Sequence, residues 1–268
     1  MEVFAQTNLQ LYNQLRRQGR SDEELRLVRA AYELACILYT GYFSADRRPF
    51  VAHTVGVASI LASVEQPALM VAAGALHNVY GNGDFGDGLY NAAPESRRRR
   101  VREAVGHDVE EIVYRFHLRR VRPMLDDGYR QSIERLAQTD MPVLLLDLAD
   151  VLEKHIDSSV LYHGDGSWIA GPVDRHGEYL VGLARRIGQH RLAVALEQGF
   201  AAVAADPGLP AVLRGPQERK HRTLVVPGSC RRRVYPVLVN AMRWLARPSG
   251  WGRTLRRFTQ RLMALGRA

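Results

Sequence analysis

The chain has 268 residues, of which 46% are hydrophobic and 24% are charged. This composition is typical of a globular protein with a sizeable core, and it excludes a wholly disordered chain. The two cysteines, Cys36 and Cys230, are too few for a disulfide scaffold or a cysteine-rich zinc module. The first residues lack the pattern of a signal peptide and no run of about 18 apolar residues occurs, so we expect neither a signal peptide nor a transmembrane helix. We therefore expect a cytoplasmic protein.

The net charge of +9 is unevenly distributed along the chain. Residues 219–268 contain 13 basic and no acidic residues, which leaves 24 basic and 28 acidic residues, a net −4, for the rest. A mildly acidic body with a strongly basic tail indicates an interaction segment at the end of the chain. It does not indicate that the body binds nucleic acid.

The first half of the chain predicts three successive helices. Ser21 with three following acidic residues is typical of a helix N-terminus, ahead of an apolar periodic segment that reaches residue 43. Pro49 begins a second predicted helix, which carries His53 on its apolar face. Pro67 begins a third that is apolar nearly all round and should lie centrally. A glycine-rich turn segment follows at 81–91.

The second half predicts further helices and then a change of character. We expect two helices between Pro94 and Phe116, broken near Gly106, then a polar helix over 128–138 and a buried one from Pro142. Residues 164–177 are predicted as loop, and 180–204 as helix. The predicted fold is all-α: a helical bundle over 1–205, a proline- and glycine-containing linker over 206–222, and a basic extension over 223–268. Strand-like alternation is best at 223–227.

Three polar residues occupy positions where the helical pattern calls for apolar ones: His53, His77 and Asp150. Buried imidazoles need hydrogen-bond partners, and a buried carboxylate needs a cation or several donors. One divalent metal ion would satisfy all three. Alternatively each has its own local partner, as when Asp150 pairs with Lys154 one helical turn on.

Three motifs resemble those of the HD-domain superfamily. They are R-x-P-F-V-A-H at 47–53, A-G-A-L-H-N at 73–78 and L-L-D-L-A-D-V-L at 145–152. They are most similar to motifs of the stringent-response guanosine tetraphosphate hydrolases of the RelA/SpoT type, and the resemblance extends over about residues 25–200. It implies that His53, His77 and Asp150 bind one or two divalent metals for phosphoester hydrolysis. Some members of the superfamily use two irons for oxygenase chemistry instead.

The sequence also departs from those motifs. The aspartate that names the superfamily is Asn78 here, and an amide oxygen is a weaker ligand for a divalent ion than a carboxylate. The acidic pair that orients water in the hydrolases corresponds to Gly81 and Asn82, and the basic residue before the third motif corresponds to Asp147. The His-Asn form is more similar to an uncharacterised bacterial group of HD-like domains.

The favoured prediction is a hydrolase of a phosphoester in a nucleotide or small phosphorylated metabolite. It would hold a single Mn, Fe or Zn ion on His53, His77 and Asp150. Asn78 and Asp147 are the candidate catalytic residues. Asp84, Asp87 and His155 are alternative acid–base groups. The other functions that we consider are an iron oxygenase on the same triad and a binding module without catalysis.

Other basic residues supply candidate contacts. Arg47 and Arg48, which precede the His53 helix, are the candidate contacts for a substrate phosphate. In the tail, apolar residues recur at helical spacing between arginines, from Trp251 to Leu265. A basic amphipathic helix suits an anionic membrane surface or an acidic partner protein, so we predict peripheral membrane association. Docking on the acidic body is the alternative, and nucleic acid is disfavoured.

Overall fold

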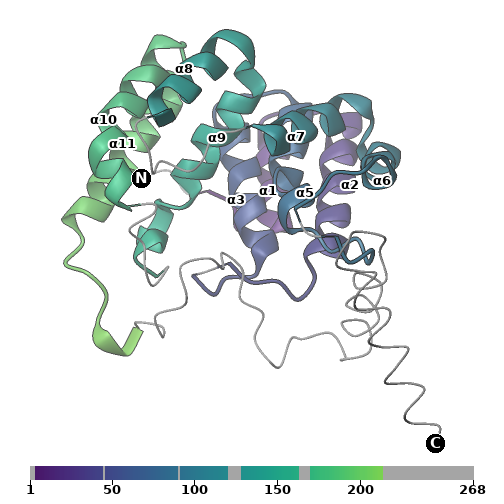
Figure 1. Cartoon of the computed structure of the whole chain (residues 1–268), viewed down its shortest axis with the longest axis horizontal. Helices are drawn as coiled ribbons and strands as arrows, with labels where there is room; N and C mark the ends of the chain where they lie inside the picture. The colour runs from purple at the N-terminus through teal and green to yellow at the C-terminus, as the bar shows by residue number, and fades with distance from the viewer. Residues whose placement is uncertain (1–3, 45, 90, 120–127, 163–169, 214–268) are drawn as a thin grey trace, which may run out of the picture.

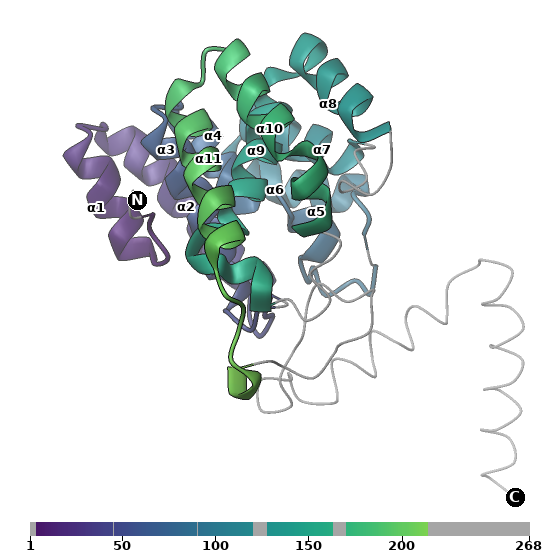
Figure 2. The same cartoon turned by 90° about the vertical axis from the view of Figure 1, so that its left-hand side faces the viewer.

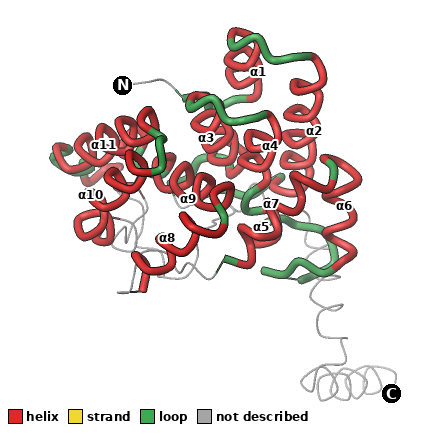
Figure 3. Tube along the Cα trace, turned by 90° about the horizontal axis from the view of Figure 1, so that it is seen from above, coloured by secondary structure: helices red, strands yellow, loops and turns green. Residues whose placement is uncertain are grey.

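The computed structural model describes residues 4–44, 46–89, 91–119, 128–162 and 170–213. Apart from one isolated bridge between Phe43 and Pro49, regular structure in these residues is helical, so the all-α prediction is confirmed (Figure 3). The helices are α1 (Asn8–Arg17), α2 (Asp22–Tyr39), α3 (Phe50–Ser63), α4 (Ala68–Leu76), α5 (Val79–Asn82), α6 (Glu95–Val105), α7 (His107–Leu118), α8 (Gly128–Thr139), α9 (Met141–Glu153), α10 (Ala170–Arg186) and α11 (His190–Ala205). Two 3-10 segments, Ile156–Tyr162 and Ala211–Leu213, complete the set.

Helix α4 lies at the centre of the bundle. It packs against α2, α3, α7 and α9, and every one of its residues except Leu69 is buried. Figure 1 shows α8, α10 and α11 gathered at one end of the molecule, α2 and α6 at the other, and α3 and α9 between them. Figure 2 views the first of these ends, where α10 and α11 run side by side. The apolar character of 68–76 therefore predicted its central place correctly.

Local signals fixed several helix ends as predicted. The Ser21 hydroxyl accepts a hydrogen bond from the Glu24 backbone N–H, and the Glu24 carboxylate accepts one from the Ser21 backbone N–H. This reciprocal capping box satisfies two amide groups that the first helical turn leaves unpaired. Gly106 separates α6 from α7 with a φ of 83°, a left-handed conformation that suits glycine. The helices predicted from Pro49 and Pro67 begin at the next residue.

Other boundaries differ from the predictions. The helix after Pro67 ends at Leu76, and His77 and Asn78 lie in the break before α5. The predicted loop over 164–177 is wrong in its second part, since α10 begins at Ala170. The single helix predicted over 180–204 is two helices, divided at Gly188, whose φ is 79°. Helix α1 was not predicted from the sequence.

The basic tail and the strand predicted at 223–227 lie outside the described residues, as does most of the predicted linker. Its described part, 206–213, is a loop that ends in the short 3-10 segment. In the described ranges no helix is long and apolar enough to cross a membrane.

The close packing of α3 on α4 depends on Gly74. A Cβ atom at this position would lie 2.8 Å from Leu61 Cδ1 and 3.1 Å from the Ala58 backbone Cα. Alanine normally stabilises a helix interior by up to about 1 kcal/mol relative to glycine. Because the two backbones cannot separate without loosening the core, we expect Gly74→Ala instead to lower the free energy of unfolding by about 1–3 kcal/mol.

The matched control is Gly182→Ala in α10, where a Cβ atom would meet nothing within 4 Å. We expect this change to raise the free energy of unfolding by about 0.5–1 kcal/mol. Urea unfolding followed by circular dichroism measures both effects. Stabilisation by both substitutions would show that α3 and α4 are not closely packed at Gly74.

Candidate metal centre

The structure brings His53, His77 and Asp150 together in the interior. His53 comes from α3, His77 caps the C-terminus of α4, and Asp150 lies on α9. One ligand atom of each residue lies within 4.8 Å of the corresponding atoms of the others, and all three residues are buried. The three residues singled out from their sequence positions thus form one group that could hold a metal ion.

The His77 ring is oriented by the backbone. Its Nδ1 lies 2.7 Å from the carbonyl oxygen of Gly74, which can only accept a hydrogen bond, so Nδ1 carries the proton. The lone pair of Nε2 therefore points toward Asp150, whose Oδ1 is 3.5 Å away. Burial lowers the pKa of His77 below its ordinary value, against the opposing influence of Asp150. A neutral ring with Nε2 facing the cluster is the form that binds a metal.

The His53 ring is oriented by a second carboxylate. Its Nδ1 is hydrogen-bonded to Glu153, and its Nε2 lies 3.2 Å from Asp150 Oδ1. Burial alone would lower the pKa of His53, but the negative charges of Glu153 and Asp150, which face its two ring nitrogens, raise it to about 9. An imidazole held by a carboxylate on one nitrogen and aimed at the cluster with the other is the usual arrangement of a metal-binding histidine.

The two oxygens of Asp150 have different surroundings. Oδ2 accepts a charged hydrogen bond from Lys154, and Oδ1 is buried without a hydrogen-bond partner of good geometry although it faces both histidines. Burial would raise the pKa of Asp150, but Lys154 and the two histidines hold it well below its ordinary value. An orphaned carboxylate oxygen facing two imidazole nitrogens fits a divalent cation with nitrogen and oxygen ligands.

Aromatic rings flank the cluster. His53 and His77 meet edge to face with centroids 5.2 Å apart, Phe50 packs on His53, and Phe116 packs on His77, each at 5.3 Å. Tyr39 extends the row beyond Phe50 at 4.8 Å. These contacts hold both imidazoles in place and exclude water from their outer faces, which strengthens electrostatic interactions inside.

The candidate catalytic residue Asn78 lies directly beside the cluster. Its half-buried side-chain amide Nδ2 is 2.7 Å from His77 Nε2, where it donates to the ring lone pair. Because the two ends of an amide exchange by rotation, the same side chain can present its oxygen at that place. Asn78 therefore lies where a weak oxygen ligand would be needed.

The other candidate catalytic residue, Asp147, is already engaged. Its Oδ1 accepts a hydrogen bond of 2.8 Å from the Arg119 Nε, at the end of α7. The Arg119 guanidinium also lies over the Phe116 ring, 3.2 Å from its centroid. Asp147 of α9 is therefore paired with a cation from the end of another helix.

The two arginines predicted to contact a phosphate have different surroundings. Arg47 is exposed, with a left-handed φ of 72°. Arg48 donates hydrogen bonds to Asp46 and, at 2.8 Å, to Glu153 Oε1, and its side chain is 28% exposed. Arg48 therefore supports the carboxylate that orients His53. Contact of either arginine with a substrate stays a prediction.

The alternative acid–base groups lie in structural interactions. Asp87 accepts two hydrogen bonds from Arg97, which also donates to the carbonyl oxygens of Leu89 and Ala92. Arg97 is 2% exposed and holds the glycine-rich segment onto α6. The Asp84 Oδ1 accepts a hydrogen bond within its own turn, from the Gly86 N–H.

Two other histidines, one of them the alternative acid–base group His155, are buried. His155 is 1% exposed; its Nδ1 donates to the Val151 carbonyl, and its ring packs on Phe200 of α11. His176 is 9% exposed and packs on Tyr129, because its segment is helical rather than loop. Neither belongs to the group formed by His53, His77 and Asp150.

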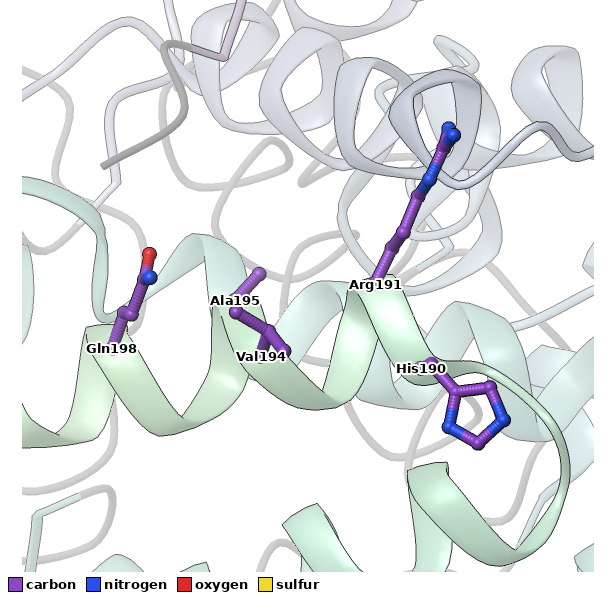
Figure 4. Close-up of a pocket in the computed structure, with 5 residues that line it drawn as sticks. All are labelled: His190, Arg191, Val194, Ala195 and Gln198. Atoms are coloured by element: carbon purple, nitrogen blue, oxygen red, sulfur yellow. The ribbon is translucent and has the colours of Figure 1, made fainter.

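A pocket elsewhere on the surface has no part in this cluster. It occupies about 430 Å³ along α11 and is lined by His190, Arg191, Val194, Ala195 and Gln198 (Figure 4). Arg191 reaches away from the helix in that view and forms an ion pair with Glu65 at 2.7 Å. All five lining residues come from one helix and are partly or fully exposed, so the pocket is a shallow groove.

Sequence reasoning missed Glu153 and Arg119. Glu153 lies three residues after Asp150 on the same helix, a spacing that places both side chains on one face. A second acidic residue inside an apolar helix was therefore a usable signal. Arg119 follows the end of its helix in a sequence with many arginines, and nothing in the spacing distinguished it.

The chain is similar over residues 39–125 to a family described as a domain of unknown function (DUF6817). These residues contain His53, His77, Asn78 and Arg119, and they end before Asp150. No curated protein matches the chain. The cluster therefore has to be interpreted from its own geometry.

Proposed function

We propose that this protein is an HD-type hydrolase that holds one divalent ion on His53, His77 and Asp150 and cleaves a phosphoester of a nucleotide or small phosphorylated metabolite. The observation that carries this proposal is the orphaned Asp150 Oδ1, which faces the ring nitrogens of both histidines in a buried site. The resemblance of three motifs to those of the HD-domain superfamily supports the same choice of residues. A divalent ion bound there would supply Lewis-acid chemistry and a nucleophilic water at neutral pH.

Cations beside the cluster support an anionic substrate. Lys154 contacts Asp150 and Arg119 contacts Asp147, and their side chains are 20% and 18% exposed. Both can therefore reach a group bound next to the cluster while they neutralise its carboxylates. A guanidinium and an ammonium, each paired with a carboxylate of α9, are groups that suit the oxygens of a phosphoryl group.

Tyr129 adds an unpaired polar group near the same place. Its hydroxyl is buried without a hydrogen-bond partner. Burial raises the pKa of Tyr129 well above its ordinary value, and the charges of Asp147, Arg119 and Asp150 act on it. A buried hydroxyl that has no partner and lies near these charged groups is suited to donate a hydrogen bond to a bound substrate.

The remaining roles follow from contacts. His77 and His53 present Nε2 to the cluster, and the aromatic rings packed against the two imidazoles exclude water from behind them. Asp147 is held in place by Arg119, whose Nε donates a hydrogen bond to Oδ1. Asn78 anchors the position next to His77 Nε2.

The direct test combines metal analysis with turnover. Full-length protein purified without oxygen should contain Mn, Zn or Fe at about one ion per chain and should hydrolyse phosphodiester or phosphomonoester reporter substrates, with loss of both on chelation. Iron with oxygen consumption and no hydrolysis would favour the oxygenase. Absence of any bound metal, with no gain on adding Mn²⁺ or Zn²⁺, would contradict the proposal.

Substitution of Asn78 tests whether an amide at this position weakens metal binding. We expect Asn78→Asp to tighten Mn²⁺ and Zn²⁺ binding by at least about tenfold, or about 1.4 kcal/mol, because a carboxylate adds charge at the place that the amide now fills. The metal-free variant should unfold more readily, since two buried carboxylates would then face each other. Calorimetric titration and thermal melts with and without metal measure both effects. Unchanged affinity would show that position 78 does not face the ion.

A further inference from the structure

Glu153 is the most completely buried carboxylate beside the metal cluster, and its two oxygens have different partners. Oε2 is hydrogen-bonded to His53 Nδ1, and Oε1 accepts from Arg48 Nη1 at 2.8 Å. The residue is 0% exposed. Burial would raise the pKa of Glu153, but His53 and Arg48 lower it below its ordinary value. Such an ion is retained in a core only when both partners hold it in place.

The surrounding chain is shaped to admit this side chain. A Cβ atom on Gly56 of α3 would lie 2.7 Å from Glu153 Cγ and 2.9 Å from its Oε1. Only glycine at 56 therefore lets the carboxylate reach His53 from α9. Arg48 is itself fixed by Asp46 and by the Gln6 side-chain oxygen, at 2.6 Å and 2.8 Å. The position of Glu153 is thus determined from three directions.

We propose that Glu153 is a positioning residue, which keeps the proton of His53 on Nδ1 and aims Nε2 at the metal position, with Arg48 fixing which carboxylate oxygen faces the ring. This inference rests on the proposed metal site. Because a carboxylate only accepts hydrogen bonds, Nδ1 must donate, which leaves Nε2 as the nitrogen that can give up its proton and bind a metal. Residues that hold a ligating histidine in this way change metal affinity by about 10–100-fold when they are replaced.

The decisive variant is Glu153→Gln, which keeps the shape and removes the charge. Arg48 needs an acceptor, so the amide oxygen should turn toward Arg48 and the NH₂ group toward His53. The amide would then donate to Nδ1 and force the proton onto Nε2, where it blocks a metal ion. We expect Zn²⁺ and Mn²⁺ binding to weaken by about 10–100-fold.

Arg48→Met combined with Glu153→Gln separates positioning from simple damage. Without Arg48 the amide is free to present its oxygen to His53, so the double variant should bind Zn²⁺ more tightly than Glu153→Gln alone. Damage to the fold would instead make the double variant worse than either single change. Glu103→Gln is the matched control, because that side chain is 68% exposed on α6 and should leave affinity unchanged.

The experiment is calorimetric titration of chelator-treated full-length protein with ZnCl₂ and MnCl₂, together with ¹⁵N NMR of its histidines. The Nδ1 of His53 should carry a proton in the wild type and lose it in Glu153→Gln, whether or not metal binds. Equal affinity and an unchanged Nδ1 signal in Glu153→Gln would overturn the positioning role. If Glu153→Gln does not fold, Glu153→Asp should keep the Nδ1 proton and bind Zn²⁺ less tightly, and wild-type affinity there would overturn it.

The two proposals fail in different ways. A wild-type protein that binds neither ion would contradict the metal-dependent hydrolase, while a proton that moves off Nδ1 in Glu153→Gln would still show that Glu153 orients His53. A wild type that binds metal, with Glu153→Gln indistinguishable from it in both measurements, would retain the metal site and reject the role of Glu153.

Discussion

Replacing His77 with alanine should abolish stoichiometric metal binding and lower the free energy of unfolding by about 2–4 kcal/mol. The ring is 1% exposed and fills the space between His53 and Phe116, so its removal leaves a cavity. The change also leaves the Gly74 carbonyl without the hydrogen bond that His77 Nδ1 donates. Metal analysis after desalting and chemical unfolding measure the two losses separately.

Two further variants separate the loss of metal binding from the loss of folding stability. His77→Gln retains an amide that can donate to Gly74, so it should be more stable than His77→Ala while it still loses the ion. His107→Ala removes a histidine whose side chain is 69% exposed, and it should change neither quantity. If His77→Ala holds as much metal as the wild type, the metal site lies elsewhere or is absent.

Much of the fold could be predicted because its signals are local. Each of these signals lies within one helical turn of the helix end that it determines. They are the capping box at Ser21, the prolines before α3 and α4, and the glycine between α6 and α7. The start of α10 could not be predicted, because its apolar residues begin only near Tyr179 and the segment before it contains glycines and a proline. Tertiary packing decides such a segment, as the burial of His176 against Tyr129 shows.

The cluster was predictable for a different reason. A polar residue on an apolar helix face needs a partner, so His53, His77 and Asp150 were recognisable as candidates for one group. The alternative was a local partner for each, and Asp150 does also pair with Lys154 one helical turn on. The supporting arginines carry no such signal. Arg48 was singled out for a different role and Arg119 was not singled out, and only the packing of α3 and α7 on α9 brings them to carboxylates.

The break between α4 and α5 shows how a predicted residue can lie in an unpredicted conformation. The sequence 68–80 continues its apolar pattern past His77, which is why one helix was expected. In the structure the chain leaves the helix at His77, and the Asn78 amide approaches His77 Nε2. A continuous helix would separate these neighbouring side chains by about 100° around its axis. The interruption therefore places both next to the cluster.

His155 should make the protein sensitive to mild acid, independently of any metal. Its ring is buried against Phe200, and its Nε2 has no hydrogen-bond partner. Burial, with a contribution from the charge of Lys154 and against the hydrogen bond to Val151 and the charge of Glu153, lowers its pKa from 6.5 to about 4. The folded protein therefore keeps this ring neutral, while the unfolded chain takes up a proton below about pH 6.5.

This difference fixes the direction and the pH range of the effect. Stability due to neutral His155 is complete above about pH 6.5, falls as the pH decreases because the unfolded state binds more protons, and falls no further below about pH 4. A difference of about 2.5 between the two pKa values corresponds to about 3 kcal/mol. Chelator-treated wild type should therefore lose about that much stability between pH 6.5 and 4 from this residue alone.

Comparison with His155→Gln isolates this contribution from other titrating groups. His77 and His117 also have lowered pKa values and add to the loss in the wild type, but they are present in both proteins. Glutamine can still donate to the Val151 carbonyl and cannot take up a proton in this range. Urea unfolding at half-unit pH intervals should show the variant less stable at pH 7 and more stable at pH 4. Parallel stability profiles for the two proteins would show that His155 titrates normally and is open to water.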